Sequence, residues 1–230
     1  MFRIDQVVLA RGRTRAAASI VAFGLLLGAF TGAAGAVETP EFPRGSAPFG
    51  VSYLRHARHY SRWLFVTPAA TNPLADPANC DLRDVGSLRF LPPPTGAGQS
   101  NTCTVDSSVG LVVVPAGAIA WPDPGEPYDA QAILAEARAN FADLKQFVVT
   151  VDGVAVRHLR RDFEFRSVVG TNVPDDNLFD LPAGYRPLAF DTIAVVLRPL
   201  SPGHHEIVTS VTYRSDGSTL DLTTDLNVVA

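Results

Sequence analysis

The spacing of apolar residues along the chain predicts two helices. The first follows Ser52, a residue type that caps helix N-termini, and extends to about Phe65. It ends before Pro68, because the residue that precedes a proline avoids the helical conformation. The second covers residues 129–146, where apolar side chains recur at helical spacing without an intervening glycine or proline.

The remaining apolar pattern is that of short β-strands joined by tight turns. Asp152-Gly153 and Asp216-Gly217 are two-residue hairpin turns, and Pro202-Gly203 suits a type II turn. The predicted strands lie at residues 86–91, 110–114, 147–151, 154–156, 190–200, 205–213 and 218–229. The last three form an antiparallel meander in this prediction, because only tight turns separate them.

These elements predict a mainly β protein with two helices. An alternation of strands and helices, which would build a parallel sheet, is absent from the sequence. The expected architecture is therefore an antiparallel β-sandwich-like single domain, in which two sheets pack face to face.

Residues 1–36 form a leader that is distinct from this domain. Arginines at its start are followed by an apolar run at residues 16–30 and by Ala34-Gly35-Ala36, a pattern that signal peptidase accepts. The run has 15 residues, fewer than the ~20 that cross a bilayer as a helix, and an uncleaved membrane anchor is the alternative. We therefore predict a signal peptide at residues 1–36 and a secreted or periplasmic β-rich domain at residues 37–230, without a membrane span.

The charge and the cysteine content of the chain indicate which partners it binds and in which compartment it folds. The chain has 19 Lys and Arg against 23 Asp and Glu, and this net charge of −4 argues against a nucleic-acid binder. Cys80 and Cys103 both follow the leader, and in an exported protein a disulfide is favoured over a metal pair or free thiols. Such a bond would close a loop that is rich in proline and glycine.

His56 and His59 are one candidate metal-binding or catalytic pair. Three residues apart on a helix, both rings can face one ion, but a third ligand such as a carboxylate is required. Arg55, Arg58 and Arg62 are interleaved with them and oppose a cation. The pattern favours a polar helix face.

The acidic loop that contains Asp175, Asp176, Asn177 and Asp180 is a second candidate. Its oxygen atoms are of the kind that Ca²⁺ binds, but the glycine and the terminal glutamate of an EF-hand are missing. Asp and Asn also satisfy the backbone of a turn through their own side chains, and we favour that interpretation. No other cofactor is indicated.

Two further polar segments are predicted to be surface features. His204 and His205 begin a strand, where neighbouring side chains face opposite ways and do not bind one ion together. Residues 157–164 carry three arginines and two acids, a pattern typical of a solvated strand face whose charges compensate. A patch for an anionic ligand is the alternative there.

Several short strings together resemble a family of uncharacterised secreted bacterial proteins. The strings are Trp63, Asn72-Pro73-Leu74, Asn79-Cys80, Thr102-Cys103-Thr104-Val105, Val151-Asp152-Gly153-Val154, Pro174-Asp175-Asp176-Asn177-Leu178-Phe179 and Pro199-Leu200-Ser201-Pro202-Gly203-His204-His205. Members of that family carry a signal peptide, a cysteine pair, a Pro-Asp-Asn type loop and a Leu-Ser-Pro-Gly-x-His turn. The resemblance implies an exported protein and supports the expected fold, and it identifies no catalytic residue.

The sequence lacks the short motifs of common enzyme classes. It contains no phosphate-binding glycine loop, no Gly-x-Ser-x-Gly, no His-Glu-x-x-His and no Cys-x-x-Cys. We therefore favour a non-catalytic module that binds a cell-surface or extracellular component, a glycan or a protein. One alternative is a secreted hydrolase that uses His56, His59 and a carboxylate of the acidic loop, and another is a structural protein stabilised by Ca²⁺.

Overall fold

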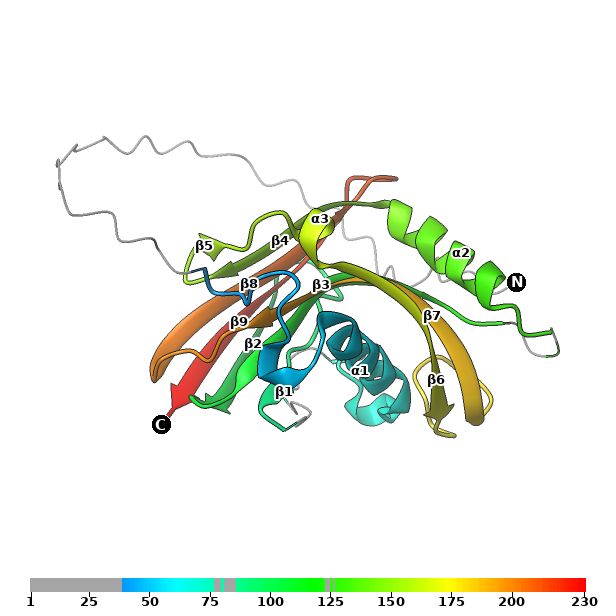
Figure 1. Ribbon diagram of the computed structural model, residues 1–230, viewed down its shortest axis with the longest axis horizontal. Helices are drawn as coiled ribbons and strands as arrows, with labels where there is room; N and C mark the ends of the chain where they lie inside the picture. Colours follow the sequence, from blue (N-terminus) through cyan, green and yellow to red (C-terminus); the bar gives the residue numbers. More distant parts are fainter. Residues whose placement is uncertain (1–38, 77–79, 81–85, 123–124, 126) are drawn as a thin grey trace. The chain divides into compact units, whose positions relative to one another are not determined.

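Figure 1 shows a computed structural model of the chain, which describes residues 39–76, 80, 86–122, 125 and 127–230. All of these residues belong to one compact unit, Thr39–Ala230. The predicted signal peptide lies outside the described residues.

The described strands form two sheets. The four-stranded sheet has the order β1-β3-β7-β6 and consists of β1 (Leu88–Phe90), β3 (Gly110–Ala120), β7 (Gly184–Leu197) and β6 (Glu164–Val173). The five-stranded sheet has the order β2-β9-β8-β4-β5 and consists of β2 (Gln99–Asp106), β9 (Thr219–Val229), β8 (Gly203–Tyr213), β4 (Leu144–Val151) and β5 (Val154–Ala155). Strand β3 contacts β8 and β4 of the other sheet. The prediction of a mainly β, sandwich-like domain is confirmed.

Most strand pairs are antiparallel, and two are parallel. The parallel pairs are β1 with β3 and β2 with β9. The β4–β5 hairpin turns at Asp152-Gly153, as predicted. The β8–β9 hairpin also forms, but it closes through residues 214–218, a longer loop than the two-residue turn expected at Asp216-Gly217. Strands β2 and β6 were not predicted, because polar residues interrupt their apolar pattern.

The predicted three-stranded meander is wrong in its first strand. Strand β7 pairs with β3 and β6, and the turn at residues 201–203 leads from one sheet into the other. The residues from Leu188 to Leu197 are all buried. A strand of this kind is favoured in the interior of a sheet that is covered on both faces, whereas a meander strand has one solvated face.

Helices α1 (Tyr53–Val66) and α2 (Ala130–Ala142) confirm the two predicted helices. Helix α2 ends four residues earlier than expected, because the chain from Leu144 onward pairs with β8 as strand β4. Short 3₁₀ turns lie at Pro48–Gly50 and Ala69–Thr71.

The segment predicted as a solvated strand face contains the short helix α3 (Leu159–Phe163) instead. Its two apolar residues, Leu159 and Phe163, are four positions apart and both buried. This is the spacing of one helical face, which the surrounding charges conceal in the sequence.

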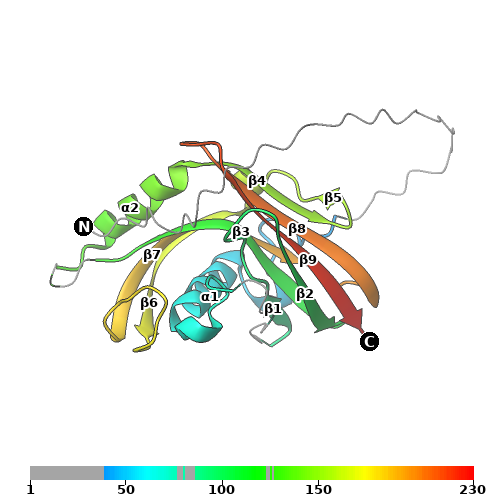
Figure 2. The same ribbon diagram turned by 180° about the vertical axis from the view of Figure 1, so that it is seen from behind.

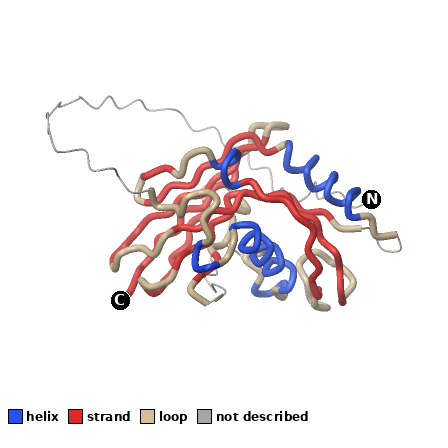
Figure 3. Tube along the Cα trace, viewed as in Figure 1, coloured by secondary structure: helices blue, strands red, loops and turns tan. Residues whose placement is uncertain are grey.

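Helices α1 and α2 cover opposite faces of the four-stranded sheet (Figures 1 and 2). Figure 3 shows the same layers, with the strands in red between the two longer helices in blue. Helix α2 packs through Ile133 and Ala137 against Ala120 of β3 and Ala189 of β7. The three alanines at this contact are small and allow the helix to approach the sheet closely.

Helix α1 packs through aromatic side chains. Tyr60 and Trp63 contact the ring of Phe90, with centroids 5.4 and 5.5 Å away. Tyr53 stacks on Phe165 of β6 at 5.7 Å, and Phe65 stacks on Phe179 at 4.2 Å. Because most of the helix is buried in this way, only a narrow stripe of α1 faces solvent.

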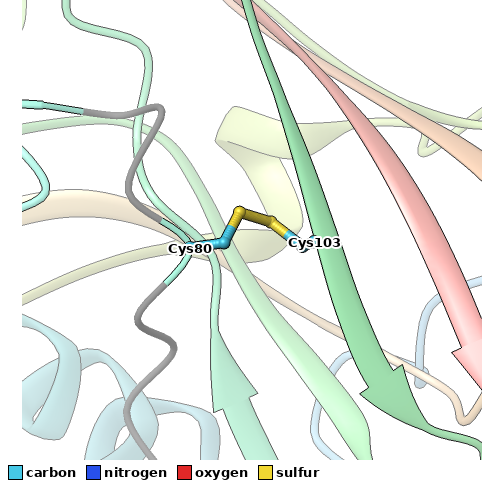
Figure 4. Close-up of a disulfide and its surroundings, with 2 residues drawn as sticks. All are labelled: Cys80 and Cys103. Carbon is cyan, nitrogen blue, oxygen red and sulfur yellow. A yellow bond between two sulfur atoms is a disulfide. The ribbon is translucent and has the colours of Figure 1, made fainter.

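Cys80 and Cys103 form the predicted disulfide (Figure 4). Their Cα atoms lie 5.4 Å apart, and Cys103 is buried on β2. The bond attaches the segment that follows α1 to the edge strand of the five-stranded sheet. The residues between the two cysteines include β1, whose Leu88 and Phe90 are buried in the core, so the covalent link adds to packing that is already present.

We predict that the double variant C80S/C103S loses about 3 kcal/mol of unfolding free energy, because the unfolded chain regains the entropy of an open loop. Replacing both residues avoids a free thiol. Urea titration of wild type and variant measures the change. Unchanged stability of the variant would contradict a structural role for the bond.

Candidate functional site

His56 is part of the core and not of an open site. Its side chain is 2% exposed, and Nε2 lies 3.2 Å from the carbonyl oxygen of Pro48. Burial lowers the pKa of His56 below its usual value. His59, one helical turn further on, is half-buried.

Asn177 organises the acidic loop from within. Its side-chain amide donates to the carbonyls of Pro174 and Leu181 at 2.8 and 2.7 Å. Its Oδ1 accepts from the backbone N–H groups of Phe179 and Leu181 at 3.1 and 2.9 Å. The other three acidic-loop candidates, Asp175, Asp176 and Asp180, are exposed. This hydrogen bonding is the one expected of a turn residue.

His56 and the acidic loop lie near opposite ends of α1, and His59 lies midway along the helix. Pro68, just beyond the helix, forms an isolated β-bridge with Asn177 of the loop. His56 lies in the first turns of the same helix, about 18 Å away along its axis at 1.5 Å per residue. The structure therefore does not bring His56 and the acidic loop together. In the described residues, no group of three or more His, Cys, Asp or Glu is placed to hold a metal ion.

His205 and Asp152 form a pair that the sequence did not reveal. Nδ1 of His205 lies 2.7 Å from Oδ2 of Asp152, and Nε2 lies 2.9 Å from the carbonyl oxygen of Ser201. The other carboxylate oxygen of Asp152 accepts from the N–H of Glu206 at 2.9 Å. Since both ring nitrogens of His205 face acceptors, the ring is best satisfied when it is protonated.

The pKa values of this pair agree with the geometry. Burial by itself lowers the pKa of His205, but the hydrogen bonds to Asp152 and Ser201 outweigh it and leave the pKa above its usual value. Burial likewise raises the pKa of Asp152, and the bonds to His205 and Glu206 bring it below its usual value. His204 points elsewhere, toward Asp225 at 3.7 Å. The pair joins two turns of the fold, and neither ring nitrogen is available to a substrate.

Arg55, Arg58 and Arg62 form a row on the exposed side of α1, which we call the arginine stripe. Residues spaced three and four apart share one helical face, so the row extends about 10 Å along the helix. Arg58 donates to the hydroxyl of Ser167 at 3.0 and 2.7 Å, and Arg62 donates to the carbonyl of Gly170 at 2.9 Å. Both acceptors are neutral groups of strand β6.

The charge of the arginine stripe is not compensated within the described part of the chain. Helix α1 contains no Asp or Glu. None of the ion pairs among the described residues involves these three guanidinium groups. Guanidinium groups bind carboxylates, phosphates and sulfates through paired N–H donors. The stripe is therefore a cationic surface in a protein of net charge −4.

A second charged cluster lies on the opposite face of the four-stranded sheet. Asp191 of β7 is fully buried, and its Oδ2 accepts from Nε of Arg166 at 3.0 Å. Arg166 also pairs with Glu164, which in turn lies 3.4 Å from Arg160 of α3. The guanidinium of Arg160 packs over the ring of Phe141 on α2, 5.1 Å from its centroid.

Burial raises the pKa of Asp191 to about 6, and the nearby charge of Glu164 adds to the shift. The guanidinium groups of Arg166 and Arg160 oppose it, but they do not cancel it. Asp191 is thus the acid in this cluster that changes its charge just below neutral pH.

No protein-family model matches the chain, and no curated protein matches it in sequence. Among solved structures, the structure of "PbICP-C in complex with falcipain-2" matches 63% of this chain and 98% of its own, with 11% identity and a TM-score of 0.24. A match of this extent establishes neither a shared fold nor a shared function.

We predict that His205→Ala costs more stability at about pH 5.5 than at about pH 8.5. A histidine whose pKa is raised by folding stabilises fully below its ordinary pKa of about 6.5, and this contribution is lost as the pH rises through the folded-state value. The side chain of Asp152 is 49% exposed, so water screens the pair and the difference between the two pH values is about 1 kcal/mol.

Urea unfolding of wild type and H205A at both pH values measures this difference. His204→Ala is the matched control, because its side chain is 64% exposed and it makes only the longer contact with Asp225. We expect H204A to change stability little at either pH. An equal cost of H205A at both pH values would show that the ring acts through packing alone.

Proposed function

We propose that this chain is an exported, non-catalytic module that binds an acidic polysaccharide through the arginine stripe. The observation that supports it is the row of three exposed guanidinium groups on α1 without a carboxylate partner in the described residues. A row of cations along a helix is complementary to a chain that repeats a carboxylate or sulfate group along its length.

The neutral acceptors on β6 strengthen this proposal. The hydroxyl of Ser167 and the carbonyl of Gly170 hold two of the guanidinium groups in place without removing their charge. A side chain that is already ordered loses less conformational entropy when it binds a ligand. Exposed ion pairs are individually weak, so several anionic groups of one polymer must bind at once.

Two sequence features support the exported location in this proposal. The leader at residues 1–36 has the pattern of a signal peptide, and Cys80 and Cys103 form a disulfide, which persists in oxidising compartments. Within the described residues, none of the helices has the length and apolar character needed to cross a membrane.

Calorimetric titration of the domain at residues 37–230 with polygalacturonate tests the proposal. We predict binding that weakens with added salt, because exposed charges are screened. The variant R55Q/R58Q/R62Q should bind at least about tenfold more weakly, since it loses all three contacts. Neutral dextran should not bind to the wild type.

The triple variant R44Q/R157Q/R214Q is the matched control, because it removes the same charge from exposed arginines outside the stripe. It should bind polygalacturonate as the wild type does. Equal losses of affinity in the two triple variants would show that binding depends only on the net charge of the protein, and would refute the stripe as the binding site. Release of new reducing ends from the polysaccharide would refute the non-catalytic part of the proposal.

A further inference from the structure

A shallow hollow lies beside α2, on the face of the sheet opposite the arginine stripe. Its volume is about 450 Å³. Its walls are Gln131, Leu134, Ala135, Arg138, Ala139 and Ala142 of α2 together with Arg166 of β6. The helix thus contributes mostly small apolar side chains, and the charged groups of the wall are two guanidiniums.

Arg166 is held in position by its two carboxylate partners. Its Nε donates to the buried Asp191, and its Nη2 pairs with Glu164. No described residue accepts a hydrogen bond from its Nη1. Because Nε and Nη2 are held in this way and Nη1 has no acceptor among the described residues, the guanidinium is preorganised to donate to a further oxygen atom.

Asp191 and Arg138 are two further charged residues that influence the electrostatic potential in the hollow. Asp191 is fully buried, and its Oδ1 has no hydrogen-bond partner among the described residues. Arg138 is exposed on α2 and forms no ion pair with a described residue. Around the hollow there are thus three positive guanidinium groups, from Arg138, Arg160 and Arg166, and two carboxylates, from Glu164 and Asp191. The net charge of this group is +1, and it becomes +2 when Asp191 is protonated.

We propose that this hollow binds a small ligand that has one carboxylate group and a short apolar chain. The carboxylate accepts hydrogen bonds from Nη1 of Arg166 and from the guanidinium of Arg138. The apolar chain lies against Leu134 and the alanines of α2. The site is separate from the arginine stripe and does not depend on the function proposed for it.

The buried Asp191 makes the affinity of this site for a carboxylate depend on pH. A bound carboxylate adds a negative charge close to Asp191 and therefore favours the protonated form of that residue. Glu164, Arg160, Arg166 and Arg138 are the other charged groups around it, and the pKa of Asp191 is raised to about 6. Affinity for the ligand should consequently rise as the pH falls from about 8 to about 5.5, where a simple carboxylic acid is still ionised.

Hexanoate is the probe for the experiment, and NMR chemical-shift titration of the ¹⁵N-labelled domain at residues 37–230 is the readout. Hexanoate should shift amides of α2 and β6 and should bind about three- to tenfold more tightly at the lower pH. Hexan-1-ol, which lacks the charge, should bind more weakly by about fivefold or more. Acetyl-Ala-Ala, which carries its carboxylate at a peptide C-terminus, shows whether the hollow also accepts that source of the same group.

The variant Arg138→Gln tests the proposed site directly, because Arg138 is exposed and its replacement leaves the buried cluster intact. It should weaken hexanoate binding about fivefold or more, whereas Arg157→Gln on the surface should not change it. Asp191→Asn should retain binding and lose its pH dependence. The proposal is refuted if hexanoate causes no shifts at the hollow, if hexan-1-ol binds equally well, or if R138Q binds as the wild type does.

Discussion

Aromatic side chains of α1 pack against the four-stranded sheet and thereby determine how the helix is oriented and which of its residues reach the surface. Tyr53, Tyr60, Trp63 and Phe65 are each at most 4% exposed, and they contact rings from β1, β6 and the acidic loop. Burial of large aromatic side chains is among the strongest contributions to a small domain. It fixes the rotation of α1, and this rotation leaves the three arginines on the only side that faces solvent.

Strand β6 links the two surfaces for which we propose ligands. Neighbouring residues of a strand point to opposite faces of a sheet, so Ser167 meets Arg58 of α1 while Arg166 faces the side of α2. Each face places guanidinium groups against this edge strand, but their surroundings differ. On the α1 side the partners of the arginines are neutral, and on the α2 side they are carboxylates, one of which is fully buried. The first surface therefore suits a charged polymer and the second a small acid.

The local sequence pattern predicted most helices and strands of the fold, but it did not predict which strands pair with one another. The cap at Ser52, the turn at Asp152-Gly153 and the disulfide depend on neighbouring residues or on composition, and all are present. The sheet to which β7 belongs depends on its pairing with β3 and β6, and pairing between separate segments is not encoded in the local pattern of β7. His205 and Asp152 are separated by 53 positions, so their contact appears only in the fold. The spacing of Arg55, Arg58 and Arg62 is visible in the sequence, but the lack of a carboxylate partner is not, because any Asp or Glu could fold against them.

The function proposed for the arginine stripe requires that its three guanidinium groups contact the polysaccharide. NMR can follow the side-chain Nε–Hε signals of all arginines while polygalacturonate is added to the domain at residues 37–230. We expect the signals of Arg55, Arg58 and Arg62 to shift together and reach saturation, while those of Arg44, Arg157 and Arg214 stay in place. Shifts of similar size at all exposed arginines, or shifts confined to arginines outside α1, would contradict it.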